Sequence, residues 1–219
     1  MGYAKGRAKR REILEQATAL FGEAGYRGTS LREIAARCDL SHPGLLHHFP
    51  TKESLLLAVL ELRDEADGQR VSAGDPSGAA ALRRLVELVS FNATRRGIVE
   101  LFTVLSAEST AADHPAHDYF VERYRRTVHS FERAYAEARA AGALRPGIDP
   151  ATAARELVAL MDGLQIQWLL NDLDLDMAAV VETHLNAQLS PDAQLSLDAQ
   201  LSLDAQLSLD AQPDPDAGA

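Results

Sequence analysis

The stretch 31–48 restricts the fold more than any other part of the chain, because it predicts two short helices joined by a tight turn. Ala35 would lie where the two helices cross, and a larger side chain there would hold them apart. Asp39 stands where the turn needs a left-handed backbone, which Asp tolerates better than most residues. Leu40 and Leu45 can then fill the angle between the helices. Such a helix-turn-helix unit presents the N-terminal end of its second helix to the major groove of DNA.

Helix-capping signals set the bounds of these helices. Ser30 and Glu33 have the spacing of a capping box, and Ser41 can cap the second helix. Pro50 ends that helix, and Thr51 can cap the next, which we expect to end near residue 67, before a loop over 68–78. Apolar side chains at helical spacing predict further helices over residues 77–95, 98–109, 114–141, 150–172 and 176–188. The predicted fold class is all-α.

The charge is distributed unevenly along the chain. The net charge is -10, but residues 1–63 carry a net +3, residues 64–189 a net -7 and residues 190–219 a net -6. A basic N-terminal arm, residues 1–11, contains five of the cations. These cations either form a solvated helix face or reach DNA. A basic end on an acidic body can hold a phosphate backbone while the rest of the molecule repels it.

Residues 10–58 resemble the TetR family of bacterial regulators. The resemblance is carried by matched positions at fixed spacing, which are Ile13-Leu14, Ala17, Leu20-Phe21, Gly25-Tyr26, Thr29-Ser30, Glu33-Ile34-Ala35, Leu40-Ser41, His48-Phe49-Pro50, Lys52-Glu53 and Leu55-Leu56. It implies a three-helix DNA-binding domain followed by a larger helical domain that binds small molecules and dimerises through its last two long helices. Two positions depart from the family pattern, because Leu46 stands where Tyr is usual and Pro43 where Gly is common.

The resemblance also implies which residues contact DNA. Thr29 and Ser30 match positions that touch phosphate, and Lys52 matches a lysine that contacts the DNA backbone. Residues 42–44 lie in the first turn of the recognition helix, where base edges are read. The complete set of expected DNA contacts is Arg10, Thr29, Ser30, Ser41, His42, Pro43, Gly44, His47, His48 and Lys52.

The remaining helices predict a sensor and dimerisation domain. Aromatic side chains on their apolar faces belong first to the core, and the resemblance makes four of them candidates for a ligand pocket, namely Phe91, Phe102, Tyr124 and Phe131. Helix 150–172 is apolar on more than one face, so a second subunit should cover one of them, and Gly163 would let the helices approach closely. The expected interface residues are Leu157, Met161, Leu164, Trp168, Val181 and His184.

We therefore expect a helix-turn-helix domain over residues 1–58, a sensor and dimerisation domain over 59–188 and a low-complexity tail over 189–219. The tail repeats the unit Ala-Gln-Leu-Ser-(Pro/Leu)-Asp. A six-residue period does not match a helix, and its leucines alternate as in a strand that has no sheet to join. We favour disorder for this tail, and a weak helix is the alternative.

The expected function is that of a transcriptional regulator, specifically a ligand-responsive repressor that binds a palindromic operator as a homodimer. Its partners would be double-stranded DNA, an unidentified small-molecule effector and a second copy of the chain. No catalytic motif and no cofactor or metal site is expected. One alternative is a metal-responsive regulator that uses His114 and His117, and another is a helical small-molecule-binding protein without a DNA role.

The sequence also predicts where the protein works. The single cysteine, Cys38, excludes an internal disulfide and is expected to be a small buried residue. The first dozen residues are too polar for a signal peptide, and no apolar run approaches the roughly 20 residues that cross a bilayer. We expect a soluble, cytoplasmic protein.

Overall fold

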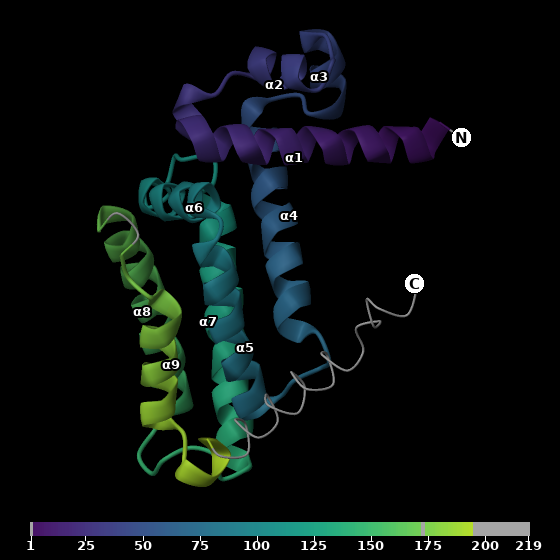
Figure 1. Cartoon of the computed structure of the whole chain (residues 1–219). Helices are drawn as coiled ribbons and strands as arrows, with labels where there is room; N and C mark the ends of the chain where they lie inside the picture. Colours follow the sequence, from purple (N-terminus) through teal and green to yellow (C-terminus); the bar gives the residue numbers. More distant parts are fainter. Residues whose placement is uncertain (1, 172–173, 195–219) are drawn as a thin grey trace, which may run out of the picture.

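The computed structural model describes residues 2–171 and 174–194, which form helices joined by short loops (Figure 1). In chain order the helices are α1 (Gly2–Gly28), α2 (Leu31–Arg37), α3 (His42–His48), α4 (Lys52–Ser72), α5 (Gly78–Ala93), α6 (Arg96–Glu108), α7 (His117–Ala140), α8 (Pro150–Leu170) and α9 (Met177–Gln188). Across these residues, strand-like pairing is confined to a single bridge between Leu144 and Leu189. The all-α prediction is confirmed.

The head, which we define as residues 2–58, is built from α1, α2, α3 and the first turns of α4. Its core is apolar and almost fully buried, because each of these helices turns its apolar stripe toward the others. Ser30, Ser41 and Thr51 cap the helices that follow them, since each hydroxyl accepts a hydrogen bond from the backbone amide three residues later. The capping signals therefore bounded α2, α3 and the start of α4 correctly.

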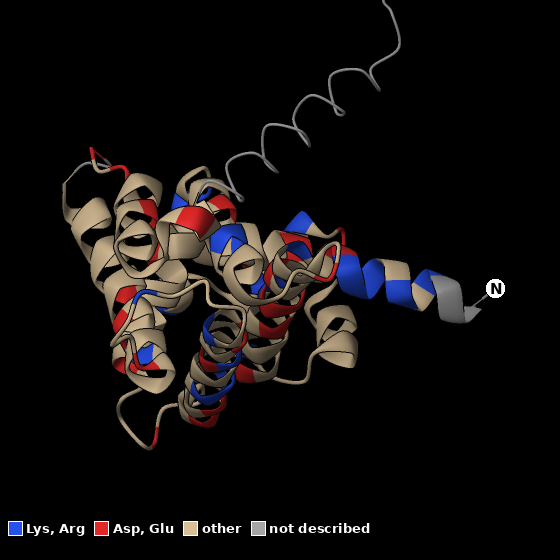
Figure 2. Cartoon of the chain, turned by 90° about the horizontal axis from the view of Figure 1, so that it is seen from below, with Lys and Arg blue, Asp and Glu red and all other residues tan. Residues whose placement is uncertain are grey.

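Helix α1 extends to Gly2, so the basic arm is a helical continuation of the head and projects beyond it (Figures 1 and 2). At the other end, Gly25 has φ 72° and ψ 165°, a combination that breaks the helix and that a residue with a side chain rarely adopts. This break turns the chain back toward α2.

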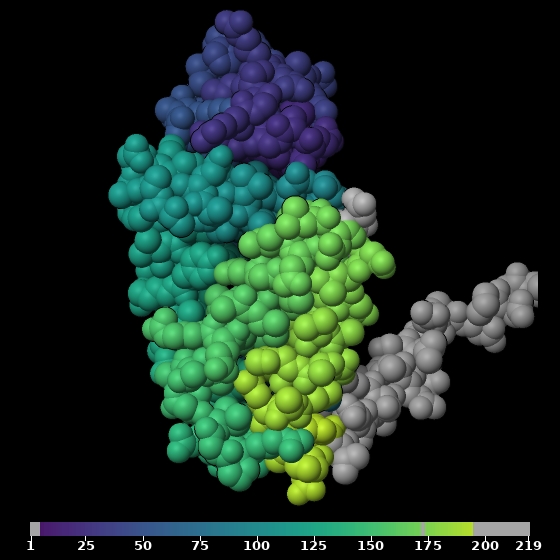
Figure 3. All heavy atoms as spheres, turned by 90° about the vertical axis from the view of Figure 1, so that its left-hand side faces the viewer, coloured from purple at the N-terminus to yellow at the C-terminus, as the bar shows by residue number. Residues whose placement is uncertain are grey.

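The body, which we define as residues 59–194, contains the rest of α4 and the helices α5 to α9. Apolar side chains of α5, α7, α8 and α9 form a second core, separate from that of the head. Helices α8 and α9 cover one face of the body (Figure 3). None of the helices in the described ranges combines the length and the apolar character that a membrane span requires.

Helix α6 joins the two regions. The apolar core of the head continues into α6 and the start of α7, through Leu101, Phe102, Leu105 and Phe120. Where α1 crosses α6, the backbones of Gly22 and Gly97 touch, and a Cβ added to Gly97 would lie 3.0 Å from Gly22 backbone atoms. Head and body therefore pack through direct backbone contact.

Two expectations about connecting segments are wrong. Helix α4 continues to Ser72, so the loop expected from residue 68 begins five residues later. The tail expected from residue 189 begins later as well, because Leu189 is fully buried and the Ser190 amide donates to the carbonyl of Ala143. Gln194 donates to the carbonyls of Asn186 and Leu189. The tail beyond residue 194 lies outside the described residues.

Candidate nucleic-acid interface and effector cavities

Helices α2 and α3 form the predicted helix-turn-helix. Ala35 is buried between them, and its carbonyl accepts a hydrogen bond of 2.9 Å from the amide of Leu40. Asp39 has φ 51°, the left-handed conformation that the turn requires. Leu45 is fully buried, while Leu40 is half-buried. The two short helices therefore meet through the residues that the sequence singled out.

The N-terminal end of α3 lies at the surface. Ser41 and Pro43 are exposed, and His42 and Gly44 are half-buried. Pro43 is in the first turn, where the absence of its N–H removes no helical hydrogen bond. This end of α3 is therefore accessible to the edge of a base or to a phosphate.

Polar and cationic side chains flank α3 on both sides. The Lys52 ammonium lies 4.4 Å from the centre of the Tyr26 ring, and partial burial lowers the pKa of Lys52. The Arg10 guanidinium donates to the carbonyl of His48 at 3.0 Å and stacks 4.1 Å from the centre of the Phe49 ring. These contacts fix both cations beside α3. Ser30 and His47 are exposed, and His48 is half-buried.

The prediction for Thr29 is wrong. Its side chain is only 2% exposed, and its hydroxyl donates to the carbonyls of Leu20 and Gly25. The hydroxyl therefore satisfies the C-terminal end of α1 instead of facing a phosphate. The family motif placed a hydroxyl residue here, but it carried no signal for the direction of that hydroxyl.

Two adjoining cavities, both partly open to solvent, lie in the body. The inner cavity, of about 40 Å³, is lined by Arg63, Phe102, Thr103, Ser106, Phe120, Arg123, Tyr124, Asp162, Gln165 and Ile166. The outer cavity, of about 250 Å³, lies between α4, α5, α7 and α8. The two share Arg63, Arg123 and Gln165 in their walls. Of the predicted pocket residues, Phe102 and Tyr124 line the inner cavity and Phe131 lines the outer one.

Phe91, the fourth predicted pocket residue, lines neither of these cavities. Its ring is held between two guanidinium groups, with Arg70 3.7 Å and Arg95 4.2 Å from the ring centre. This arrangement is a cation–π sandwich, in which the ring stabilises the positions of two arginines. The structure therefore does not bring Phe91 together with the other three predicted pocket residues.

Ion pairs that the sequence analysis missed surround the cavities. Asp64 on α4 accepts hydrogen bonds from the Tyr119 hydroxyl at 2.6 Å and from the Arg123 Nε at 3.0 Å. A second carboxylate on α4, Asp67, lies 2.7 Å from Arg63 and 3.2 Å from Arg95. One signal was available, because Arg63 and Asp67 have the spacing of an ion pair on one helix face.

Another carboxylate faces the inner cavity from α8. The Tyr124 hydroxyl donates to Asp162 at 2.8 Å. Burial raises the pKa of Asp162, and burial together with the nearby carboxylate raises the pKa of Tyr124 to about 12. Tyr124 therefore stays protonated and keeps donating to Asp162 at physiological pH.

Four of the predicted dimer contacts face the wrong way. Leu157, Leu164, Trp168 and Val181 are buried in the core of their own subunit. Met161 and His184 are half-buried, and Met161 lines the outer cavity. The apolar side chains that α8 and α9 leave exposed are Ile166 at 48%, Leu170 at 76% and Val180 at 36%. The two-sided apolar character of α8 was predicted correctly, but its inner and outer faces were exchanged.

The two histidines of the alternative metal site, His114 and His117, both contact nearby residues. The Nδ1 of His114 lies 3.0 Å from the Ser109 hydroxyl, and the Nδ1 of His117 lies 2.8 Å from the Ser109 carbonyl oxygen. Among the residues that the structure describes, no group of three or more His, Cys, Asp or Glu side chains is placed to hold a metal ion. The metal-responsive alternative is not favoured.

The chain matches two protein families. Residues 13–59 match the family described as "Bacterial regulatory proteins, tetR family", and these residues contain α2, α3 and the start of α4. Residues 59–190, more than half of the chain, match the family described as "BetI-type transcriptional repressor, C-terminal". Together the two matches cover both the head and the body.

Individual relatives agree with these matches. The HTH-type transcriptional repressor Rv3405c of Mycobacterium tuberculosis is 49% identical over 49 residues, which are 22% of this chain and 26% of that protein. The chain thus matches about a quarter of that relative's length. A protein of Saccharomonospora viridis, solved in complex with choline, is 26% identical with a TM-score of 0.70, over 83% of this chain and 97% of that one. SmeT, the repressor of the Stenotrophomonas maltophilia multidrug efflux pump SmeDEF, was solved with triclosan and is 25% identical with a TM-score of 0.73, over 85% of this chain and 94% of that one.

Proposed function

Because the chain belongs to the TetR family of bacterial transcriptional regulators, we propose that it represses transcription as a homodimer on a palindromic operator and that a small molecule releases it. One observation carries the DNA-binding part: Ser41 and Pro43, at the N-terminal end of α3, are exposed at the surface of the head. The chain would work in the cytoplasm, beside the DNA. We assign DNA binding to residues 1–58 and sensing and dimerisation to residues 59–188.

We assign the recognition of bases to the first turn of α3 and the binding of phosphates to the polar and cationic side chains beside it. His42, Pro43 and Gly44 occupy that turn, and Leu46 can offer an apolar contact to a thymine methyl group. Lys52 and Ser30 lie on either side, where a point charge and a hydroxyl suit phosphate oxygens. Arg10, His47 and His48 supply further donors along α3.

Dimerisation uses the outward face of α8 and α9. Ile166, Leu170 and Val180 are large apolar side chains that the subunit leaves exposed on these helices. A second copy that covers them gains about 25 cal/mol for each Å² of apolar surface removed from water. A two-fold dimer places two recognition helices about one turn of DNA (roughly 34 Å) apart, and this spacing fixes the two half-sites of the operator.

The effector occupies the cavities of the body. Helix α4 forms part of their wall and also begins in the head, so a ligand that displaces α4 changes the position of the recognition helices. A ligand with equal affinity for both positions would release nothing, so the effector must prefer the state that does not fit the operator. The choline and triclosan complexes of two relatives support a small-molecule effector.

Selection of bound sequences from a random DNA pool tests the DNA-binding proposal. We expect a palindrome with half-sites one helical turn apart. The variant Lys52→Ala should then weaken binding to every selected sequence similarly. It should also reduce the slope of log binding constant against log salt concentration by about one, because one phosphate contact is lost. Binding measured against salt concentration on two operators checks this. A loss restricted to one sequence would contradict the assignment of Lys52 to a phosphate.

Sedimentation of the variant Leu170→Glu tests the dimer. We expect the dissociation constant of the dimer to rise at least tenfold, because a carboxylate would replace an exposed leucine that the partner covers. Val121→Glu is the matched control, because Val121 is also exposed but lies on α7. An interface on α7 would reverse the two results, and an equal response of both variants would refute the α8 and α9 interface.

A further inference from the structure

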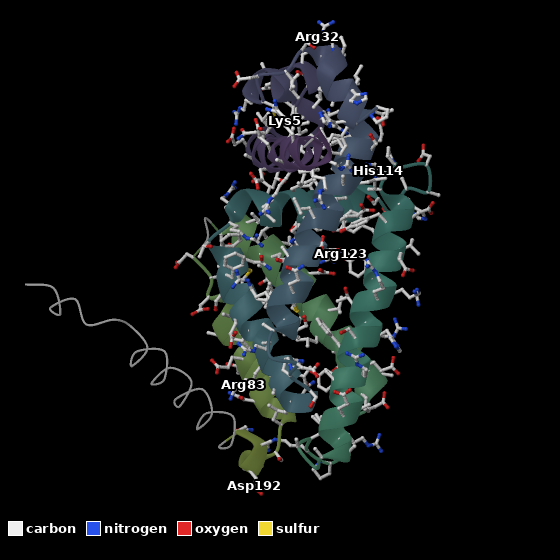
Figure 4. All side chains as sticks on the ribbon, turned by 90° about the vertical axis from the view of Figure 1, so that its right-hand side faces the viewer. Lys5, Arg32, Arg83, His114, Arg123 and Asp192 are labelled. Carbon is white, nitrogen blue, oxygen red and sulfur yellow. The ribbon has the colours of Figure 1, made fainter. Side chains whose placement is uncertain are left out.

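Two guanidinium groups, that of Arg63 buried and that of Arg123 half-buried, lie between the inner cavity and the outer cavity. Arg63 on α4 and Arg123 on α7 line both cavities, and the Arg63 side chain is only 8% exposed. Both groups lie over the same ring, with Arg63 3.9 Å and Arg123 5.4 Å from the centre of Phe102. Figure 4 shows Arg123 in the middle of the body, close to α4. Arginine is rarely buried without partners that use its donors.

Most of the donors on these two arginines are unused. The Nε of Arg63 lies 2.7 Å from an Asp67 oxygen, but their orientation does not make a hydrogen bond. Arg123 donates through Nε to Asp64. Within the described part of the chain, neither arginine donates a hydrogen bond from its terminal nitrogens. The Arg63 Nε is buried without a hydrogen-bond acceptor, which is costly, and the unused terminal N–H groups of both arginines can donate to an incoming acceptor.

The local charge balance identifies that acceptor as an anion. Arg63, Arg123 and Arg126 line the cavities together with Asp64, Asp67 and Asp162. The cavity walls thus contain three arginines and three aspartates, while Arg95 and Glu122 pair with Asp67 and Arg126 from outside the walls. Burial raises the pKa of Asp162 and so favours its neutral form. When Asp162 is neutral, the walls have three arginines against two carboxylates, which is an excess of positive charge.

The outer cavity defines the rest of the ligand. Its apolar wall consists of Val71, Leu85, Leu88, Phe131 and Met161. Its volume of about 250 Å³ can hold a body the size of an aromatic ring, whereas the inner cavity of about 40 Å³ has room for little more than a water molecule. A ligand that contacts both the arginines and the apolar wall of the outer cavity has a charged end and an apolar body.

We propose that the effector is a small organic acid whose carboxylate binds between the Arg63 and Arg123 guanidinium groups and whose apolar body occupies the outer cavity. Guanidinium and carboxylate groups match in geometry, because two parallel N–H groups can donate to two oxygens. This proposal rests on the proposed function, since it names the chemical class of the effector. Arg123 on α7 also holds Asp64 of α4, so the acid competes with a contact that positions α4.

Calorimetry on the full chain with three probes of similar size tests the proposal. Benzoate is the acid, benzyl alcohol its neutral counterpart and benzylamine its cationic counterpart. We expect benzoate to bind at least roughly tenfold more tightly than the other two, because it alone supplies charged acceptors to both arginines. Equal binding of the alcohol, tighter binding of the amine at Asp162, or no binding of benzoate would each overturn the proposal.

Variants locate the bound acid. Arg63→Met and Arg123→Met should each weaken benzoate at least roughly tenfold. Arg84→Met is the matched control, since Arg84 lies on α5 and pairs with Glu87 at 2.8 Å, away from both cavities. Circular dichroism checks that each variant is folded, and Arg63→Lys preserves the charge if Arg63→Met does not fold. Unchanged benzoate affinity in folded arginine variants would overturn the proposal, and the probe comparison on the unaltered chain decides the matter without any variant.

Two further measurements separate the possible failures. Inorganic phosphate offers charge without an apolar body, so phosphate binding as tight as that of benzoate would refute the role of the outer cavity. Operator binding is measured on the same preparations. A chain that binds DNA but not benzoate refutes the acid and leaves the repressor in place. A chain that binds benzoate but no DNA refutes the repressor and leaves the acid site.

Discussion

The interiors of the head and the body differ in the side chains that fill them. The centre of the head is built from apolar side chains such as Phe21, Ile34 and Phe49, which are almost completely buried there. The centre of the body contains Arg63, Asp67 and their partners beside two cavities. A closely packed apolar core has one shape, whereas a core with charges and open volume can rearrange around a ligand. We therefore expect the head to be rigid and the body to adapt its shape to a ligand.

Replacing one phenylalanine in each region gives the largest test of this comparison. Phe49→Ala removes a buried ring from the head and should lower the free energy of unfolding by about 3–5 kcal/mol. Phe91→Ala removes a half-buried ring from between two arginines of the body and should cost about 1–2 kcal/mol. Urea denaturation followed by circular dichroism measures both. Equal losses would show that the two interiors are packed alike.

The contact between the two regions gives the next largest effect. Gly97→Ala places a Cβ 3.0 Å from the backbone of Gly22, and neither backbone can give way cheaply, so we expect a loss of about 1–3 kcal/mol. Gly68→Ala is the control, since a Cβ at this helical position meets no described atom within 4 Å and should stabilise the chain by about 0.5–1 kcal/mol. Thermal unfolding separates the two. A stabilised Gly97→Ala chain would mean that head and body are not pressed together.

Removing one charge from the body gives the smallest effect. Burial raises the pKa of Asp162 in the folded chain above its unfolded value. Stability from proton binding is therefore present below the unfolded pKa and is lost as the pH rises through the folded pKa. Asp162→Asn avoids this loss and should be more stable than the original chain at pH 7, with a gain that shrinks toward pH 4. Unfolding curves over that pH range check it, and a gain that grows as the pH falls would contradict the assignment.

The sequence predicted the head well because local rules decide its structure. Ser30, Ser41 and Thr51 cap helices through contacts only three residues away, and the left-handed Asp39 belongs to one turn. The exception is Thr29, whose hydroxyl bonds to Leu20 and Gly25 of the preceding helix. A family pattern fixes which residue stands at a position, but the direction of its side chain depends on the packed neighbours.

The sequence predicted the body less well because contacts between distant residues decide its structure. Periodicity found α8 and its two apolar faces, but it could not tell which face meets α7 and which remains exposed, so Leu157 and Trp168 were assigned to the wrong side. Phe91 has the same apolar spacing as a pocket residue, yet Arg70 and Arg95 enclose it. The pair of Asp64 with Arg123 joins α4 to α7 across 59 residues of sequence, a separation at which no spacing rule applies.

The crossing of Gly22 over Gly97 limits how heads and bodies can be exchanged within the family. In a chimaera that combines this body with another head, a β-carbon at the position of Gly22 would lie 3.2 Å from the Gly97 backbone. The imported domain would then have to shift by a few tenths of an ångström at the seam that also contains Arg27 and Glu108, whose charged groups lie 3.3 Å apart. Whether a DNA-binding domain can be combined with this sensor domain would thus depend on the missing side chains of Gly22 and Gly97, which belong neither to the proposed DNA contacts nor to the proposed effector site.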